Sequence, residues 1–247
     1  YQPVYKVKGL AGAVYEITAD EDIITPDGTL RYHKGDVVDT VTTDEDGFAK
    51  SKELYLGKYT VVEIKAPNGM VINNEKHSVE LTYAGQDVAV TETVTSFYNE
   101  RQKVKISLEK VLEQNDIFGI GKNDEIKNIS FGLYAKEDIV SSSGTVIPAD
   151  GLIEIITLDE NGTAIANTDL PFGSYYIKEI TTDEHYILSD TQYPFTFEYA
   201  GQDIEIVEIK VNDGKPIENK LIYGSVSGKK IDENGEALGG ALIGIFK

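Results

Sequence analysis

Hydrophobic and polar residues alternate with a period of two along most of the chain. Val104, Ile106 and Leu108 are separated by polar or charged residues, and the runs 59–61 and 175–177 follow the same rule. A period of two directs one face of a β-strand into a core and the other face into water. The pattern therefore predicts short strands with one buried face, and little of the chain fits a helix.

Short polar segments separate these runs, and six of them contain a residue pair that tolerates the positive φ of a tight turn. The pairs are Asp27-Gly28, Asp46-Gly47, Ser143-Gly144, Asn161-Gly162, Asp213-Gly214 and Asn234-Gly235. About seven short strands in a unit of roughly a hundred residues is the pattern of an immunoglobulin-like β-sandwich. We therefore expect an all-β fold made of tandem sandwich domains.

The chain contains an internal repeat. The segment Tyr83–Asp87 recurs as Tyr199–Asp203, which is 116 residues further on, and Glu63 and Glu179 are separated by the same offset. Segment Gly240–Phe246 resembles the opening of both units, so a third copy begins there. Because a residue that recurs in the same context is constrained by that context, the repeat also predicts which positions matter.

The repeat divides the sequence into three parts. Residues 1–100 and 101–222, here called unit one and unit two, are each expected to form a sandwich, and residues 223–247 to start a truncated third unit. The connections near 99–102 and 219–223 are short, which favours a stiff rod. We expect the sequence to be a piece of a longer secreted chain.

Composition excludes several classes of function. The 247 residues are 40% hydrophobic and 26% charged, which is typical of a globular protein. The net charge of −19 is spread along the chain, which argues against nucleic acid and against anionic membranes as partners. No apolar run could span a bilayer, and the absence of cysteine removes disulfides and thiolate nucleophiles.

Metals and cofactors are not expected either. The acidic turns lack the downstream glutamate of an EF-hand calcium loop. His33, His77 and His185 are scattered among the repeats with no spacing that suits a metal site.

Three polar residues of unit two interrupt the hydrophobic face. Lys110 continues the inward series of the strand at 104–108, Glu179 continues that of 175–177, and Asn219 shares a face with Ile217. Burial of an unpaired charge costs several kcal/mol, so isolated inward charges are rare. The three residues are therefore predicted to form one buried cluster, and the alternative to a reactive cluster is a triad that is only hydrogen-bonded.

The spacing of asparagine and lysine repeats as well. From Asn99 to Lys110 is 11 residues, and from Asn219 to Lys230 is again 11. Each closing asparagine is thus followed by a lysine in the first strand of the next unit. Unit one contributes Glu63 and Asn99, whereas the truncated third unit has only Lys230.

In these features the chain resembles the Cna B-type, or SpaA-type, prealbumin-like repeat domains of Gram-positive surface adhesins and pilins. The segments that carry the resemblance are Leu10–Tyr15, Thr43–Gly47, Glu63–Gly69, Leu158–Gly162, Leu170–Tyr175 and Leu238–Ala241. They occur in order along nearly the whole chain.

The resemblance implies a spontaneous isopeptide bond between Lys110 and Asn219, with Glu179 as the assisting acid. An apolar environment disfavours charge, so a neutral amine could attack the amide while a protonated acid hydrogen-bonds to its carbonyl. Folding would hold the reacting groups together. Such a reaction happens once per molecule, so we do not expect an enzyme.

For unit one the resemblance assigns Glu63 and Asn99, but the lysine is open. Lys6, in the run Val4–Val7, is the first choice. The alternatives are Lys8, a lysine upstream of Tyr1, and no bond at all. Lys230 is expected to lack a partner unless a neighbouring chain supplies one.

Two functions follow from the resemblance. The first is a structural stalk segment of an adhesin or pilin, secreted and anchored to the cell wall of a Gram-positive bacterium, with further repeats of the same chain as neighbours. The alternative is a module that binds a host ligand, either a matrix protein or a glycan.

Overall fold

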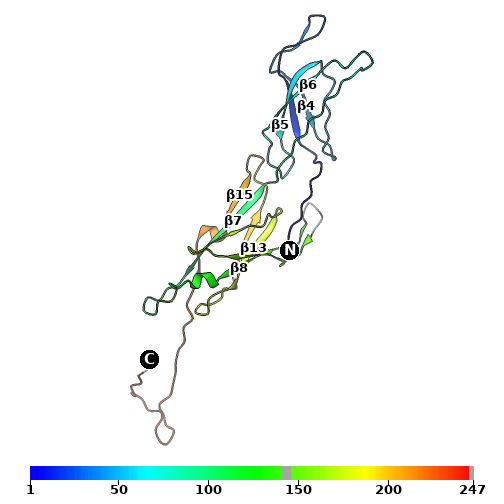
Figure 1. Cartoon of the computed structure of the whole chain (residues 1–247). Helices are drawn as coiled ribbons and strands as arrows, with labels where there is room; N and C mark the ends of the chain where they lie inside the picture. Colours follow the sequence, from blue (N-terminus) through cyan, green and yellow to red (C-terminus); the bar gives the residue numbers. More distant parts are fainter. Residues whose placement is uncertain (141–145, 245–247) are drawn as a thin grey trace.

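The computed structural model describes residues 1–140 and 146–244, so the turn expected at Ser143-Gly144 lies outside the described residues. Figure 1 shows an elongated molecule with two β-rich units along its length and a C-terminal segment that leads away from unit two. In the described residues the helical elements are two 3-10 turns, η1 (Glu125–Asn128) and η2 (Val211–Gly214). The all-β prediction is confirmed. Within the described part of the chain, no helix has the length and apolar character needed to cross a bilayer.

Unit one is built on a single antiparallel sheet in the order β4-β1-β5-β6. Its strands are β1 (Val14–Ala19), β4 (Val37–Thr42), β5 (Gly57–Lys65) and β6 (Lys76–Leu81), with a small hairpin of β2 (Ile23–Ile24) and β3 (Leu30–Tyr32). Tyr59 and Val61 alternate with more exposed neighbours along β5, as the period of two predicts. They pack with Ile17, Ala19, Ile23 and Val38 on one face of the sheet.

Unit two has two sheets. The first has the order β11-β8-β13-β14 and the second the order β12-β7-β15, with β16 also paired to β7. The strands are β7 (Lys103–Leu112), β8 (Ser130–Ala135), β11 (Leu152–Thr157), β12 (Thr163–Ala166), β13 (Gly173–Thr181), β14 (Gln192–Phe197), β15 (Ile206–Lys210) and β16 (Ile217–Asn219). Strands β9 (Ile139–Val140) and β10 (Val146–Ile147) come between β8 and β11 in the sequence and pair with each other.

The first and last strands of unit two are neighbours. Strand β16 pairs with β7 in parallel, with Ile217 opposite Lys110 and Asn219 opposite Leu112. The side chains between the two sheets form one closed core, in which Ile106 and Leu108 of β7 pack with Phe131 and residues of β13. This arrangement brings the two ends of the unit together at its centre.

Among the described residues, unit one has no second sheet like that of unit two. Residues 1–13 and 82–100 form no strand. In the described structure, therefore, no strand like β7 organises the second layer of unit one. The difference explains why the buried core of unit one is much smaller than that of unit two.

The N-terminal segment leaves unit one and runs along unit two, where Figure 1 places the N terminus. The Tyr1 ammonium donates a hydrogen bond to the carbonyl of Leu152 at 2.8 Å. The Arg101 guanidinium lies 3.2 Å from the centre of the Tyr5 ring and forms an ion pair with Asp169. Burial raises the pKa of Tyr5 to about 12, so its hydroxyl stays protonated and donates to the carbonyl of Asp169.

Candidate crosslinking site

Lys110 is buried because of its place on β7. The side chains of Ile106, Leu108 and Lys110 alternate with less buried neighbours, so all three face the core of unit two. Only 2% of Lys110 is exposed to solvent. A lysine in such a position has to find its polar partners inside the protein.

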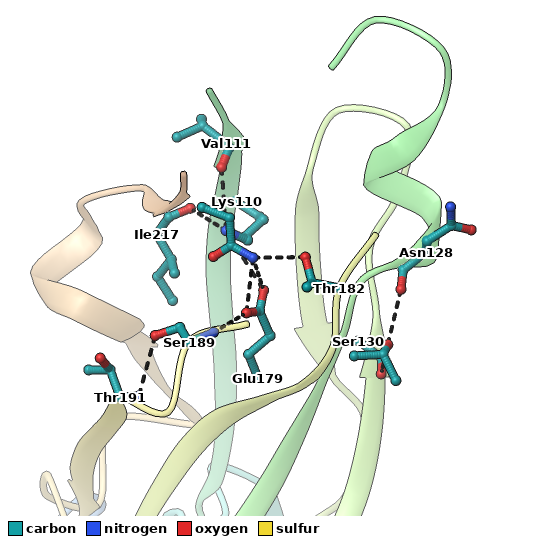
Figure 2. A network of polar contacts seen from close by, with 11 residues as sticks. Lys110, Val111, Asn128, Ser130, Glu179, Thr182, Ser189, Thr191 and Ile217 are labelled. Atoms are coloured by element: carbon teal, nitrogen blue, oxygen red, sulfur yellow. Dashed lines mark hydrogen bonds and ion pairs between the residues drawn. The ribbon is translucent and has the colours of Figure 1, made fainter. Parts of the chain in front are cut away.

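Glu179 and Asn219 are the side chains that face it. Glu179 lies on β13 of the opposite sheet, with its Oε1 atom 3.8 Å from Nζ of Lys110. The Nδ2 atom of Asn219, at the end of β16, donates to Oε1 and Oε2 of Glu179 at 2.8 and 3.0 Å. The structure therefore brings all three residues together, and Figure 2 shows Lys110 and Glu179 pointing into the same space.

Neighbouring groups orient this cluster. The backbone N–H of Ser189 donates to Oε2 of Glu179 at 2.9 Å, and the Thr182 hydroxyl accepts from Nδ2 of Asn219 at 2.9 Å. Nζ of Lys110 donates to the backbone carbonyls of Val111 and Ile217. Both Ser189 and Thr182 follow β13 in loops, and nothing in the alternation of the sequence pointed to them.

The carbonyl oxygen of the Asn219 side chain is buried, and among the described residues it has no hydrogen-bond partner. The oxygen and nitrogen of an amide are nearly equal in size, so a rotation by half a turn exchanges their places. After that rotation Oδ1 would face Glu179, where a protonated carboxyl group could donate to it. The cluster therefore accommodates the amide orientation that acid assistance requires.

The environment changes the acidity of the lysine. Removal of the ammonium from water lowers the pKa of Lys110 from 10.5 to about 8, although the nearby charges of Glu179 and Glu218 act in the opposite direction. A lower pKa increases the fraction of neutral amine at neutral pH, and only the neutral amine is a nucleophile.

Unit one repeats part of this geometry. Oε2 of the buried Glu63 accepts from Nδ2 of Asn99 and from the backbone N–H of Asn73, each at 2.7 Å. Asn73 is the counterpart of Ser189 at the same offset of 116. Tyr15 lies nearby, and burial together with the charge of Glu63 raises its pKa to about 12. Oε1 of Glu63 is buried, and within the described chain no hydrogen bond of good geometry reaches it.

The structure does not bring Lys6 to this pair. Lys6 and Lys8 are exposed in a segment without strand structure, and in the described residues no hydrogen bond or ion pair joins Lys6 to Glu63 or Asn99. The run Val4–Val7 is thus not part of the sheet of unit one, because it leaves for unit two.

A groove of about 650 Å³ lies in unit one on the side where a second sheet would pack. Tyr15, Tyr59 and Phe97 line it together with segments 47–56 and 88–97. Phe131, the counterpart of Tyr15 in unit two, belongs to the closed core that β7 completes.

Lys230 lies beyond unit two. Its side chain is exposed in the segment that follows β16, and its backbone carbonyl accepts a hydrogen bond from Leu238. The neighbouring bridge between Ile231 and Ala237 marks a short turn. The motif Gly240–Phe246 is described only as far as Gly244.

Comparisons with known proteins agree with this architecture. The model of the SpaA family, described as a prealbumin-like fold domain, matches residues 4–95 and again 118–215. The trypsin-resistant surface T6 protein of Streptococcus pyogenes is 28% identical over 139 residues, which are 55% of this chain and 24% of that protein. This chain therefore spans about a quarter of the length of that curated relative.

One solved structure gives a similar result for the fold. The TIE protein of Bacillus anthracis is 21% identical, with a TM-score of 0.52 over 94% of this chain and 38% of its own. A minor pilin of Streptococcus agalactiae is 17% identical over 93% of this chain and 92% of its own, but its TM-score of 0.34 carries no argument. Since the family model covers most of both units, the chain belongs to the SpaA family of prealbumin-like fold domains.

Proposed function

We propose that unit two joins Lys110 to Asn219 through an isopeptide bond, with Glu179 as the assisting acid. The observation that carries this proposal is the set of distances at one buried point: the carboxylate of Glu179 lies 3.8 Å from the Lys110 amine and 2.8 Å from the Asn219 amide nitrogen. An ion pair alone would explain the lysine and the glutamate but not the asparagine; a triad that is only hydrogen-bonded would explain all three, and the intact mass distinguishes it from a covalent bond.

The reaction balances without any added reagent. The ammonium of Lys110 passes a proton to Glu179, which leaves a neutral amine and a protonated carboxyl group. The amine attacks Cγ of Asn219 while the carboxyl group hydrogen-bonds to Oδ1, and the bond from Cγ to Nδ2 then breaks. The attacking nitrogen gives up a proton and Nδ2 takes one up, with Glu179 as the carrier, so Nδ2 leaves as ammonia and Nζ and Cγ are joined as an amide. The fold supplies the proximity that makes an amine and an amide react.

The bond would have a mechanical role. Because β7 and β16 lie side by side, a link between Lys110 and Asn219 carries a pulling force directly from the start of unit two to its end. The hydrogen bonds of residues 111–218 would not be loaded. This property suits a stalk segment of a Gram-positive surface protein or pilin, which is the function we propose, and the relative in Streptococcus pyogenes is itself a surface protein. Attachment to the cell wall belongs to the same proposal.

Binding of a host matrix protein or glycan remains an untested alternative. A screen of the full chain against matrix proteins and glycans would decide it, and a ligand bound by one unit at low micromolar concentration would replace the stalk with a binding module.

The first prediction concerns the intact mass. The full chain is expected to weigh less than its sequence by one ammonia, because unit two contains a complete triad and unit one does not. High-resolution mass spectrometry measures this directly. A folded protein with the unmodified mass would contradict the proposal, and Lys6→Arg is expected to leave the loss of one ammonia unchanged.

The second prediction concerns the role of Glu179. Glu179→Ala is expected to fold and yet leave Lys110 and Asn219 unlinked, because nothing then takes up the lysine proton or polarises the amide. Peptide mapping after trypsin digestion detects the branched peptide or its absence. Glu63→Ala is the matched control in unit one and should leave the crosslink of unit two intact; a branched peptide in Glu179→Ala would refute the assigned role.

A further inference from the structure

The repeated segment Tyr199–Asp203 of unit two lies against unit one. Oε1 of Gln202 accepts a hydrogen bond from the backbone N–H of Ala66 at 2.9 Å, and its backbone carbonyl accepts from Ile72 at 3.0 Å. The hydroxyl of Tyr199 donates to the carbonyl of Met70 at 3.1 Å. Nε2 of Gln202 also donates to the carbonyl of Ile64 at 3.4 Å. The five-residue loop of unit two thus bonds four backbone groups of unit one.

Gln102 holds the same loop from the connection between the units. Its Oε1 atom accepts from the N–H of Ala200 at 2.8 Å, and its Nε2 atom donates to the carbonyls of Gly201 and Ile204 at 2.9 and 2.6 Å. Gln102 is almost fully buried. Every partner of the Gln102 and Gln202 side chains in the described residues is therefore a backbone group. We call this set of contacts the glutamine lock.

Unit one carries the same loop, and in the described residues no hydrogen bond joins that loop to another unit. Gly85 has a φ of 109° and Gly201 one of 103°, and each glycine carbonyl accepts from the residue three positions later at 3.3 Å. The shape of the loop therefore does not depend on docking. Tyr83 is 68% exposed, whereas Tyr199 is 36% exposed.

Unit two presents the complementary surface at its other end. The counterparts of Ala66 and Ile72 are Thr182 and Leu188, and within the described residues their backbone N–H groups make no hydrogen bond. Ile187 and Leu188 are 55% and 50% exposed. In unit one the equivalent residues, Val71 and Ile72, are half-buried, and the N–H of Ile72 donates to Gln202 of the loop of unit two.

We infer that the Tyr-Ala-Gly-Gln-Asp loop is a docking element between units, and that Tyr83–Asp87 binds the end of another prealbumin-like unit, through groups like Thr182 and Leu188 of a second copy of this chain. Ile222 occupies the position of Gln102 at that end. The N–H of Ile222 donates to the carbonyl of His185, just as the N–H of Gln102 donates to the carbonyl of Gly69. Isoleucine cannot make the side-chain hydrogen bonds that Gln102 makes, so the contact at that end depends on Tyr83 and Gln86 alone. We therefore expect it to be weak between separate molecules. This inference does not depend on the isopeptide bond.

The first part of the inference, that the loop is a docking element, can be tested at the junction between units one and two. Gln202→Ala is expected to increase hydrogen exchange at the Ala66 amide about tenfold, because its acceptor is removed. Gln86→Ala, the same substitution in the exposed copy of the loop, should leave Ala66 unchanged. Equal protection of Ala66 in the wild type and in Gln202→Ala would overturn the lock, while the intact mass reports separately on the crosslink.

The second part of the inference, that Tyr83–Asp87 binds a second copy of the chain, can be tested with the exposed loop. The chain has no cysteine, so Val88→Cys gives a single site for a nitroxide label beside the loop. Labelled chain is mixed at millimolar concentration with isotope-labelled chain that carries no nitroxide. Broadening confined to the amides of Thr182, Ile187 and Leu188, and lost when Gln86→Ala is added to the labelled chain, supports the docking. Uniform broadening, or none, overturns it.

Discussion

Asn219→Ala is expected to lower the free energy of unfolding of unit two by about 5 kcal/mol. The substitution removes the proposed crosslink between residues 110 and 219, and closure of a loop of about a hundred residues stabilises a fold by about that amount through the entropy of the unfolded chain. Guanidinium denaturation followed by tyrosine fluorescence measures the change, since the chain has 15 tyrosines and no tryptophan.

Asn99→Ala is the matched control for this prediction. Asn99 donates hydrogen bonds to Glu63 and to the carbonyl of Val71, so its loss is expected to cost about 1–2 kcal/mol. The structure shows no lysine beside this pair, and hence no crosslink is lost with it. An equally small effect of Asn219→Ala would mean that unit two is not covalently closed.

The unlinked variant is also expected to become more stable as the pH rises. With Asn219→Ala, Lys110 keeps a free amine whose pKa is about 8 in the folded state, against 10.5 for an ordinary lysine. Below pH 8 both states hold the proton and the full cost of a buried ammonium remains. Between these values only the unfolded state is protonated, so stability rises, by up to about 3 kcal/mol at pH 10.5.

Lys110→Met in the same Asn219→Ala background isolates this effect. The buried tyrosines also titrate at high pH, and the difference between the two variants removes their contribution. In the wild type with the proposed crosslink, Nζ would be an amide nitrogen, which does not titrate in this range. A stability difference between the two variants that does not change from pH 7 to pH 10 would refute the low pKa of Lys110.

The period of two by itself predicted which way Lys110 points. Side chains of a strand alternate between its faces, so a lysine that follows Ile106 and Leu108 at even spacing has to enter the core they enter. The repeat then indicated Glu179 and Asn219 as its partners, because both recur in unit one. These inferences need only local geometry and the comparison of two copies.

Other features depended on how the chain packs. Val4–Val7 reads like a strand that could carry Lys6 into unit one, yet Tyr1 and Tyr5 bind unit two and draw the segment away. Thr182 and Ser189 orient the cluster from loops whose course no periodic pattern describes.

Gln202 shows the same division between sequence and structure. The sequence marked it only as a repeated residue, and Gln102, which holds the same loop through Ala200 and Gly201, was not marked at all. Alternation depends on neighbouring residues and repetition on the comparison of two segments, so both can be recognised without the packed structure, and they predicted most strands, the fold class and the buried triad. The path of the N-terminal segment, the empty second layer of unit one and the glutamine lock depend on contacts between residues up to 164 positions apart, which only the packed chain decides.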